Sequence, residues 1–128
     1  MPKYMLLLYA GEAGPEERAQ REAELPRWIE LNESLRAAGV LVSSDRLHPA
    51  DSATTVRVRD GETDIVDGPF AVTKELLGGY YILECADLDD ALKQAARIPL
   101  ARYGSVEVRP LMELGASIGL EEAAAAGS

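Results

Sequence analysis

The residues best suited to acid–base chemistry lie close together near the middle of the chain. Asp67 begins the sequence Asp-Gly-Pro-Phe, and Lys74 and Glu75 follow a few residues later. A carboxylate with a cation nearby is typical of acid–base sites. Pro69 fixes its own φ and restricts Gly68, so the turn that carries Asp67 has a constrained backbone. We therefore predict that Asp67 is the catalytic group of a site beside this turn.

Phe70 adds a flat apolar surface to the same stretch, and with Lys74 and Glu75 it is predicted to bind a ligand on the rim of the site. A second interpretation is open. Asp67 would then only accept hydrogen bonds from the N–H groups of the turn, and Lys74 and Glu75 would form a solvated surface pair.

Two further charged residues alternate with valines in the last predicted strand. Glu107 and Arg109 lie on the strand face opposite Val106 and Val108. An arginine there is suited to bidentate binding of an anionic ligand. The alternative is an ion pair between subunits.

The remaining candidates carry weaker patterns. His48 is the only histidine and lies in a polar loop, where it either binds a ligand or is merely exposed. Tyr81 is a candidate for lining an apolar pocket, although core packing is the default for a strand tyrosine. One histidine and one cysteine far apart make no metal cluster, and no phosphate-binding loop or dinucleotide fingerprint occurs. We expect neither a metal nor a cofactor.

The elements that would position these residues follow one order along the chain. Apolar runs, helical spacing and turn residues predict strand, helix, strand, hairpin, strand, helix and strand. The corresponding segments are 4–9, 15–38, 40–42, 56–66, 80–83, 87–98 and 105–110, with 43–53 as a loop. Pro26 interrupts the segment 15–38, where it either kinks the helix or starts a second one at its first turn. This order predicts an α+β fold of the ferredoxin-like type with a β-hairpin inserted in its middle.

The first strand is apolar at every position, whereas two helices cover only one face of such a sheet. A second copy of the chain is the simplest cover for the other face, so we expect a homodimer.

Composition bounds the remaining possibilities. The chain has 128 residues, a net charge of −9 and one cysteine. An acidic surface disfavours nucleic acid and anionic membranes as partners, and one cysteine is consistent with a reducing cytoplasm. With no signal peptide or spanning segment, the chain is expected to be cytoplasmic. Residues 115–128 form a low-complexity tail after a single domain of residues 1–114.

Several short motifs together carry a family resemblance. They include Lys-Tyr-Met-Leu-Leu from position 3, Asp-Gly-Pro-Phe from 67, Leu-Gly-Gly-Tyr-Tyr from 77 and Val-Glu-Val-Arg-Pro from 106. With them, residues 3–111 resemble the YCII-related family, in its DGPF-motif branch. The resemblance implies a dimeric α/β barrel, in which two ferredoxin-like sheets pack face to face with pockets inside.

The chemistry that the resemblance implies fits this chain poorly. Members of the wider family have a proposed catalytic His-Asp pair, and one relative is a dehydrochlorinase. The corresponding positions here are Trp28 and Ile98, neither of which transfers a proton. Genes of the DGPF branch often accompany extracytoplasmic-function sigma factors. The expected function is therefore a small-molecule-binding or accessory regulatory dimer, and the alternative is a small lyase or isomerase that uses Asp67.

Overall fold

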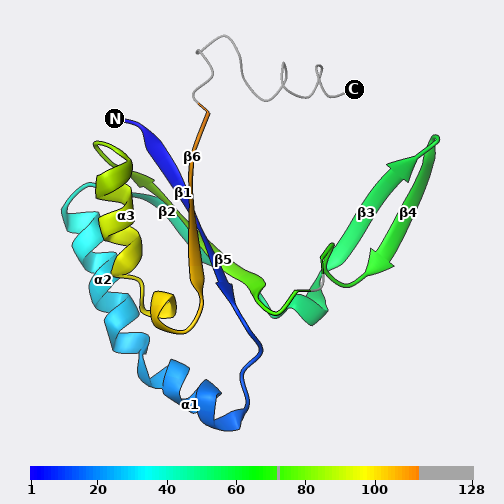
Figure 1. Ribbon diagram of the computed structural model, residues 1–128, viewed down its shortest axis with the longest axis horizontal. Coiled ribbons are helices and arrows are strands. Elements are labelled where there is room, and N and C mark those ends of the chain that lie inside the picture. The colour runs from blue at the N-terminus through cyan, green and yellow to red at the C-terminus, as the bar shows by residue number, and fades with distance from the viewer. Residues whose placement is uncertain (72, 113–128) are drawn as a thin grey trace.

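The computed structural model describes residues 1–71 and 73–112 of the chain. In this part the protein has an α+β fold, with helices on one face of a four-stranded antiparallel sheet and a separate two-stranded sheet (Figure 1). The four-stranded sheet consists of β1 (Lys3–Ala10), β2 (Leu41–Arg46), β5 (Leu76–Glu84) and β6 (Ser105–Pro110). The helices are α1 (Pro15–Ala23), α2 (Leu25–Ala37) and α3 (Leu88–Ala96), with short 3-10 turns η1 (Ala50–Ser52) and η2 (Pro99–Arg102). The tail predicted at 115–128 lies outside the described residues.

The strand order of the main sheet is β2-β5-β1-β6, and every neighbouring pair is antiparallel. The central strand β1 pairs with β5 on one side and with β6 on the other, so Leu7 lies opposite both Tyr80 and Glu107. The register shifts between Leu8 and Tyr9 and again between Leu41 and Ser43 in the edge strand β2. The mixed α+β class expected from the order of elements is confirmed.

The hydrophobic core lies between the sheet and the helices. Alternate residues of β1 point to opposite faces, and Tyr4, Leu6 and Leu8 are buried on the helix side. Leu31 and Leu35 of α2, one helical turn apart, face them. The rest of the core comes mainly from β5, α3 and the segment after α3, namely Tyr81, Leu83, Cys85, Ala91, Ala95, Ile98 and Leu100.

Residues at the helix ends explain where the helices begin and end. Pro26 lies in the first turn of α2, which begins immediately after the end of α1. At the other end of α2 the N–H groups of Gly39 and Val40 donate to carbonyls in the last helical turn, which closes the helix. The side chain of Asp87 accepts a hydrogen bond of 2.8 Å from the N–H of Asp90 and caps α3.

The second strand of the sheet is longer than the prediction of 40–42. It extends to Arg46 through residues that were expected to form a loop. Ser44 and Asp45 pair with Tyr81 and Tyr80 of β5. An edge strand is held by backbone hydrogen bonds on one side only and tolerates polar side chains, so it lacks the apolar signature of the other strands.

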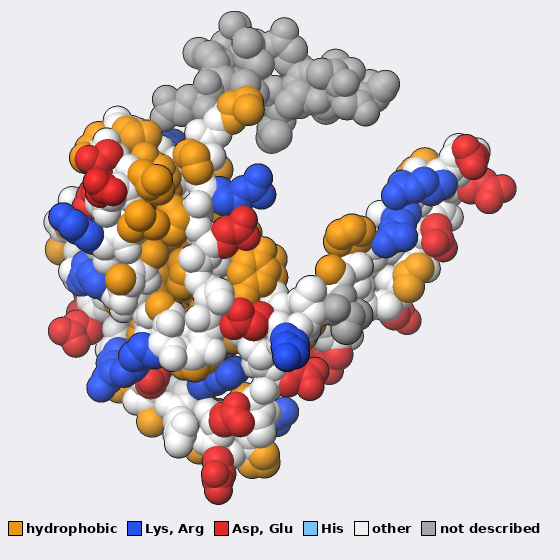
Figure 2. All heavy atoms as spheres, in the orientation of Figure 1, with side chains coloured by type: hydrophobic (Ala, Val, Ile, Leu, Met, Phe, Trp, Pro, Cys, Tyr) orange, Lys and Arg blue, Asp and Glu red, His pale blue; other side chains and the backbone are white. Residues whose placement is uncertain are grey.

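β3 (Thr54–Arg59) and β4 (Glu62–Asp67) form the two-stranded sheet, here called the arm. The strands are antiparallel and are joined through Asp60 and Gly61. Figure 1 shows the arm projecting away from the four-stranded sheet, and Figure 2 shows it standing clear of the rest of the molecule. A pair of strands this size has no core of its own.

Candidate functional site

The Asp-Gly-Pro-Phe turn is fixed at the base of the arm. Gly68 has a φ of 108°, a region of backbone conformation that L side chains rarely adopt. Its N–H donates to the carbonyl of Ala53 at 2.7 Å, and its own carbonyl accepts from the hydroxyl of Thr55 at 2.8 Å. Asp67, the last residue of β4, is exposed beside this turn. The carboxylate therefore projects into solvent from a backbone that is tied to β3.

Phe70 is also exposed, with 75% of its surface accessible. The guanidinium of Arg57 on β3 lies over its ring, 5.2 Å from the centroid. A cation over an aromatic face is attracted by the quadrupole of the ring, and at an exposed position this interaction is worth about 0.5–1 kcal/mol. Phe70 thus packs against the arm that carries Asp67.

Glu75 is connected to the main sheet. Its Oε1 accepts a hydrogen bond of 2.7 Å from the hydroxyl of Ser105, the first residue of β6. The hydroxyl of Thr73 donates to the Glu75 carbonyl. Lys74 is exposed. The predicted rim residues are therefore separated, with Asp67 and Phe70 at the base of the arm and Glu75, next to the exposed Lys74, against the start of β6.

The sheet face away from the helices carries apolar side chains flanked by polar ones, and is here called the open face. Its centre consists of Met5, Leu7, Tyr80 and Ile82, which the strand register brings together and which are partly buried. At one margin the hydroxyl of Tyr80 donates to Asp45 Oδ2 at 2.9 Å.

The opposite margin of the open face carries Glu107 and Arg109. Arg109 pairs with Met5, whose side chain lies on the open face. The strand face predicted for Arg109, opposite Val106 and Val108, is therefore the open face. Its Nε is 3.8 Å from Glu107 Oε2, and both side chains are at least half exposed. An exposed pair at this distance contributes little to stability, so the guanidinium is available to a ligand.

Tyr81 lies on the other side of the sheet from Arg109. It is buried in the core, and its hydroxyl donates to Asn32 Oδ1 of α2 at 2.5 Å. Burial raises the pKa of Tyr81, and the hydrogen bond with Asn32 and the charge of Arg36 oppose that rise. His48 is exposed in the segment between β2 and η1. Within one chain the sheet separates Tyr81 from Arg109, whereas the neighbouring Tyr80 shares the open face with Arg109.

The positions of the family's proposed His-Asp pair are also defined. Trp28 packs against the core from α2, and Ile98 is buried in it. Both side chains therefore contribute apolar packing.

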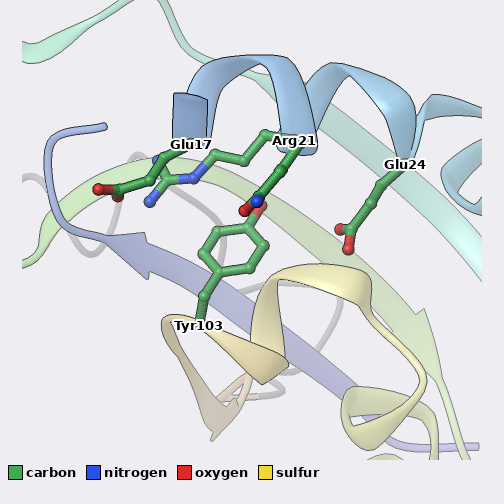
Figure 3. Close-up of a pocket in the computed structure, with 5 residues that line it drawn as sticks. Glu17, Arg21, Glu24 and Tyr103 are labelled. Carbon is green, nitrogen blue, oxygen red and sulfur yellow. The ribbon is translucent and has the colours of Figure 1, made fainter. Parts of the chain in front are cut away.

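A pocket that the sequence patterns did not indicate lies between α1 and η2 (Figure 3). It has a volume of about 100 Å³ and is lined by Glu17, Gln20, Arg21, Glu24 and Tyr103. The guanidinium of Arg21 lies 4.4 Å from the centroid of the Tyr103 ring, and its Nη1 donates to the Gly11 carbonyl at 3.1 Å.

Charge interactions surround this pocket. Arg102 forms an ion pair with Glu24 Oε1. The other carboxylate oxygen of Glu24 is buried and has no hydrogen-bond partner among the described residues. Burial raises the pKa of the Tyr103 hydroxyl, and the charge of Arg21 opposes that rise. Helical spacing places the three lining residues of α1 and its C-cap residue Glu24 on one face, but only the folded chain brings Tyr103 beneath them.

Over residues 1–71 and 73–112, no group of three or more His, Cys, Asp or Glu side chains could hold a metal ion. No helix in the same part of the chain is long and apolar enough to cross a membrane.

Comparison with known proteins identifies a relative and a family. The chain is 50% identical over 76 residues to an uncharacterized protein of Rhizobium meliloti (strain 1021). The alignment covers 58% of this chain and 61% of that relative. The YCII-related domain matches residues 2–115, which include all four strands of the main sheet and the arm. The chain therefore belongs to the YCII-related domain family.

Proposed function

We propose that the protein is a homodimer that binds a small molecule between two sheets packed face to face. In this proposal the strand order β2-β5-β1-β6, with its helices on one side, is a ferredoxin-like plan, and the dimer is an α/β barrel. The Asp-Gly-Pro-Phe sequence at 67–70 supports, as part of the proposal, membership of the DGPF-motif branch of the family.

The open face is the observation that carries the proposal. Leu7 and Ile82 lie at its centre, on the opposite side of the sheet from the helices. An antiparallel sheet with one solvated face usually has polar side chains there, whereas these positions are apolar. A second copy of the same face would remove both sets of apolar side chains from water, with an area-based gain of roughly 25 cal/mol for each Å² buried.

The margins of the open face suggest the kind of ligand. Arg109 would bind an anionic group, and Tyr80 with Asp45 offers a hydroxyl and a carboxylate at the other margin. The apolar centre between them suits a flat ring. We infer a compact aromatic or unsaturated carboxylate as the ligand class.

The dimer is tested by sedimentation at micromolar concentration with Leu7→Asp as the variant. We expect the unaltered chain to sediment as a dimer. Leu7→Asp places a charge at the centre of the interface and is expected to give a folded monomer, because an unpaired buried charge is strongly unfavourable. A stable monomer of the unaltered chain at this concentration would disprove the proposal.

The ligand class is tested by thermal shift with benzoate, salicylate and phenylacetate as probes. One or more of these probes is expected to stabilise the protein. Arg109→Ala is expected to weaken the binding of that probe at least tenfold, because a charge-assisted hydrogen-bonded contact is lost. Arg27→Ala, at an exposed position on α2, serves as the matched control. Equal affinities in the two variants would exclude Arg109 as the anion-binding group.

The proposed cellular role rests on the proposed family branch. An accessory or regulatory dimer associated with extracytoplasmic-function sigma factors is consistent with apolar residues at both positions of the His-Asp pair. The alternative is a small lyase or isomerase that uses Asp67. The fixed turn, with its carboxylate exposed, favours that alternative, because a preorganised acid–base group requires a rigid backbone.

A further inference from the structure

The arm has one apolar and one charged side. In its antiparallel register Val56 lies opposite Ile65, and Val58 lies on the same side as this pair. The other side carries the oppositely charged cross-strand pairs Arg57–Asp64 and Arg59–Glu62. Such a division is expected of a strand pair that covers another surface with its apolar side.

The apolar side is uncovered within one chain. Val56, Val58 and Ile65 are 60%, 57% and 65% exposed. The hydrogen bonds of Gly68 with Ala53 and Thr55 tie the two strands of the arm together at its base. The Leu47 N–H donates to the Gly78 carbonyl and extends the pairing of β2 with β5 by one residue, where the chain leaves the main sheet toward the arm. The arm itself projects outward from that base (Figure 1). Isolated two-stranded hairpins are marginally stable in water, so this side requires a partner.

We propose that the arm packs its apolar side on a second copy of this chain, so that each protomer clasps the other. The inference rests on the proposed homodimer and adds a second contact to it. A twofold axis makes the clasp reciprocal, because each arm then covers the same surface on its partner.

The area that a stable dimer requires favours a second copy as the partner. With strands about 4.8 Å apart and a rise of about 3.3 Å per residue, a four-stranded face six residues long projects to roughly 400 Å². A specific interface usually buries about 800 Å² per partner, so the open face supplies about half. The arm contributes roughly 200 Å², and the surface that receives the partner's arm contributes as much again. Reciprocal clasping therefore supplies the missing half.

The same register gives the arm a functional consequence. Asp67 pairs with Thr54 and lies on the apolar side of the arm, in line with Ile65. Docking of that side on the second copy therefore brings the carboxylate of Asp67 to the edge of the interface. The site proposed beside the turn is then composite, with Asp67 from one chain and surface from the other.

The clasp is tested with Ile65→Asp and the matched variant Val66→Asp, measured by sedimentation. Ile65 and Val66 are adjacent in β4. Val66 is 51% exposed and lies on the charged side of the arm. Ile65→Asp is expected to raise the dimer dissociation constant at least tenfold, whereas Val66→Asp changes it less than threefold. Equal dissociation constants, in variants that keep the far-ultraviolet circular dichroism of the unaltered chain, would overturn the clasp.

Cysteine labelling tests the same contact without disrupting it. The only natural cysteine, Cys85, is buried, so Val58→Cys provides one accessible thiol. Its reaction rate with a maleimide is measured at protein concentrations below and above the dimer dissociation constant. The rate is expected to fall at least fivefold at the higher concentrations, whereas the rate for Val66→Cys is expected to be the same at all concentrations. If Leu7→Asp dissociates the dimer but Val58→Cys is never protected, the clasp is wrong and the face-to-face dimer stands. A monomeric unaltered chain would instead overturn both.

Discussion

Replacement of Gly68 by alanine isolates the contribution of the turn that carries Asp67. The φ of 108° lies where residues with a Cβ are strained by about 1–3 kcal/mol. A Cβ built at this position has no atom within 4 Å, so steric overlap adds nothing to the backbone term.

The turn offers one way to relieve this strain. If it opens, it loses the hydrogen bonds from Gly68 to Ala53 and from Thr55 to Gly68, which together are worth about 1–3 kcal/mol. The cost is therefore about the same whether the variant keeps the strained turn or opens it. Gly68→Ala is expected to reduce the stability of the turn by about 1–3 kcal/mol.

Urea unfolding followed by circular dichroism measures the global part of this loss, and hydrogen exchange at amide 68 measures local opening. Gly78→Ala is the control, since its φ is not positive and its Cβ would lie 3.9 Å from the Leu8 carbonyl oxygen, an ordinary contact. We expect the control to keep or slightly increase stability. If Gly68→Ala retains both its urea midpoint and the protection of amide 68, the turn is not strained and the reasoning is wrong.

Three further predictions concern the sheet and the site. Gly79→Ala places a Cβ 2.9 Å from the Asp45 carbonyl oxygen, which is too close. We therefore expect urea unfolding to show a loss of about 1–3 kcal/mol in stability, in contrast to Gly78→Ala. Equal stability of the two variants would contradict this expectation. Burial raises the pKa of Tyr81 above its usual value of about 10, so the unfolded chain loses this proton first and stability falls as pH rises above 10. Tyr81→Phe should remove this part of the decline in thermal unfolding between pH 9 and 12, and an unchanged pH profile would refute the assignment. Asp67→Asn should keep the melting temperature within a few degrees yet weaken ligand binding about tenfold, measured with a probe that stabilises the unaltered chain, and unchanged affinity would exclude Asp67 from the site.

Much of the fold was predictable because its signals are local. The glycine that follows α2, the aspartate that caps α3 and the spacing of Leu31 and Leu35 each fix one element through neighbouring residues. The end of β2 was not predictable in the same way. Ser43 to Arg46 carries no apolar alternation and becomes a strand only because β5 offers unpaired backbone groups beside it.

The candidate site was predictable only in part. The constrained turn at Gly68 follows from the sequence, whereas the separation of Asp67 from Glu75 depends on which strand each contacts. The choice between Tyr80 and Tyr81 had no sequence signal, since β5 is apolar on both sides and alternation does not identify the core face. The pocket at Tyr103 required contact between residues about eighty positions apart.

The two outer strands of the main sheet restrict how another strand could be added to it. β2 presents Asp45 and Arg46 along a strand whose register is interrupted, and β6 ends at Pro110, which has no N–H to donate. Irregular, charged or proline-containing borders resist the addition of another strand. Growth of the sheet by lateral addition, the route to fibrils, is therefore disfavoured at both borders. The proposed face-to-face dimer uses neither border, which is consistent with a closed pair that stops at two chains.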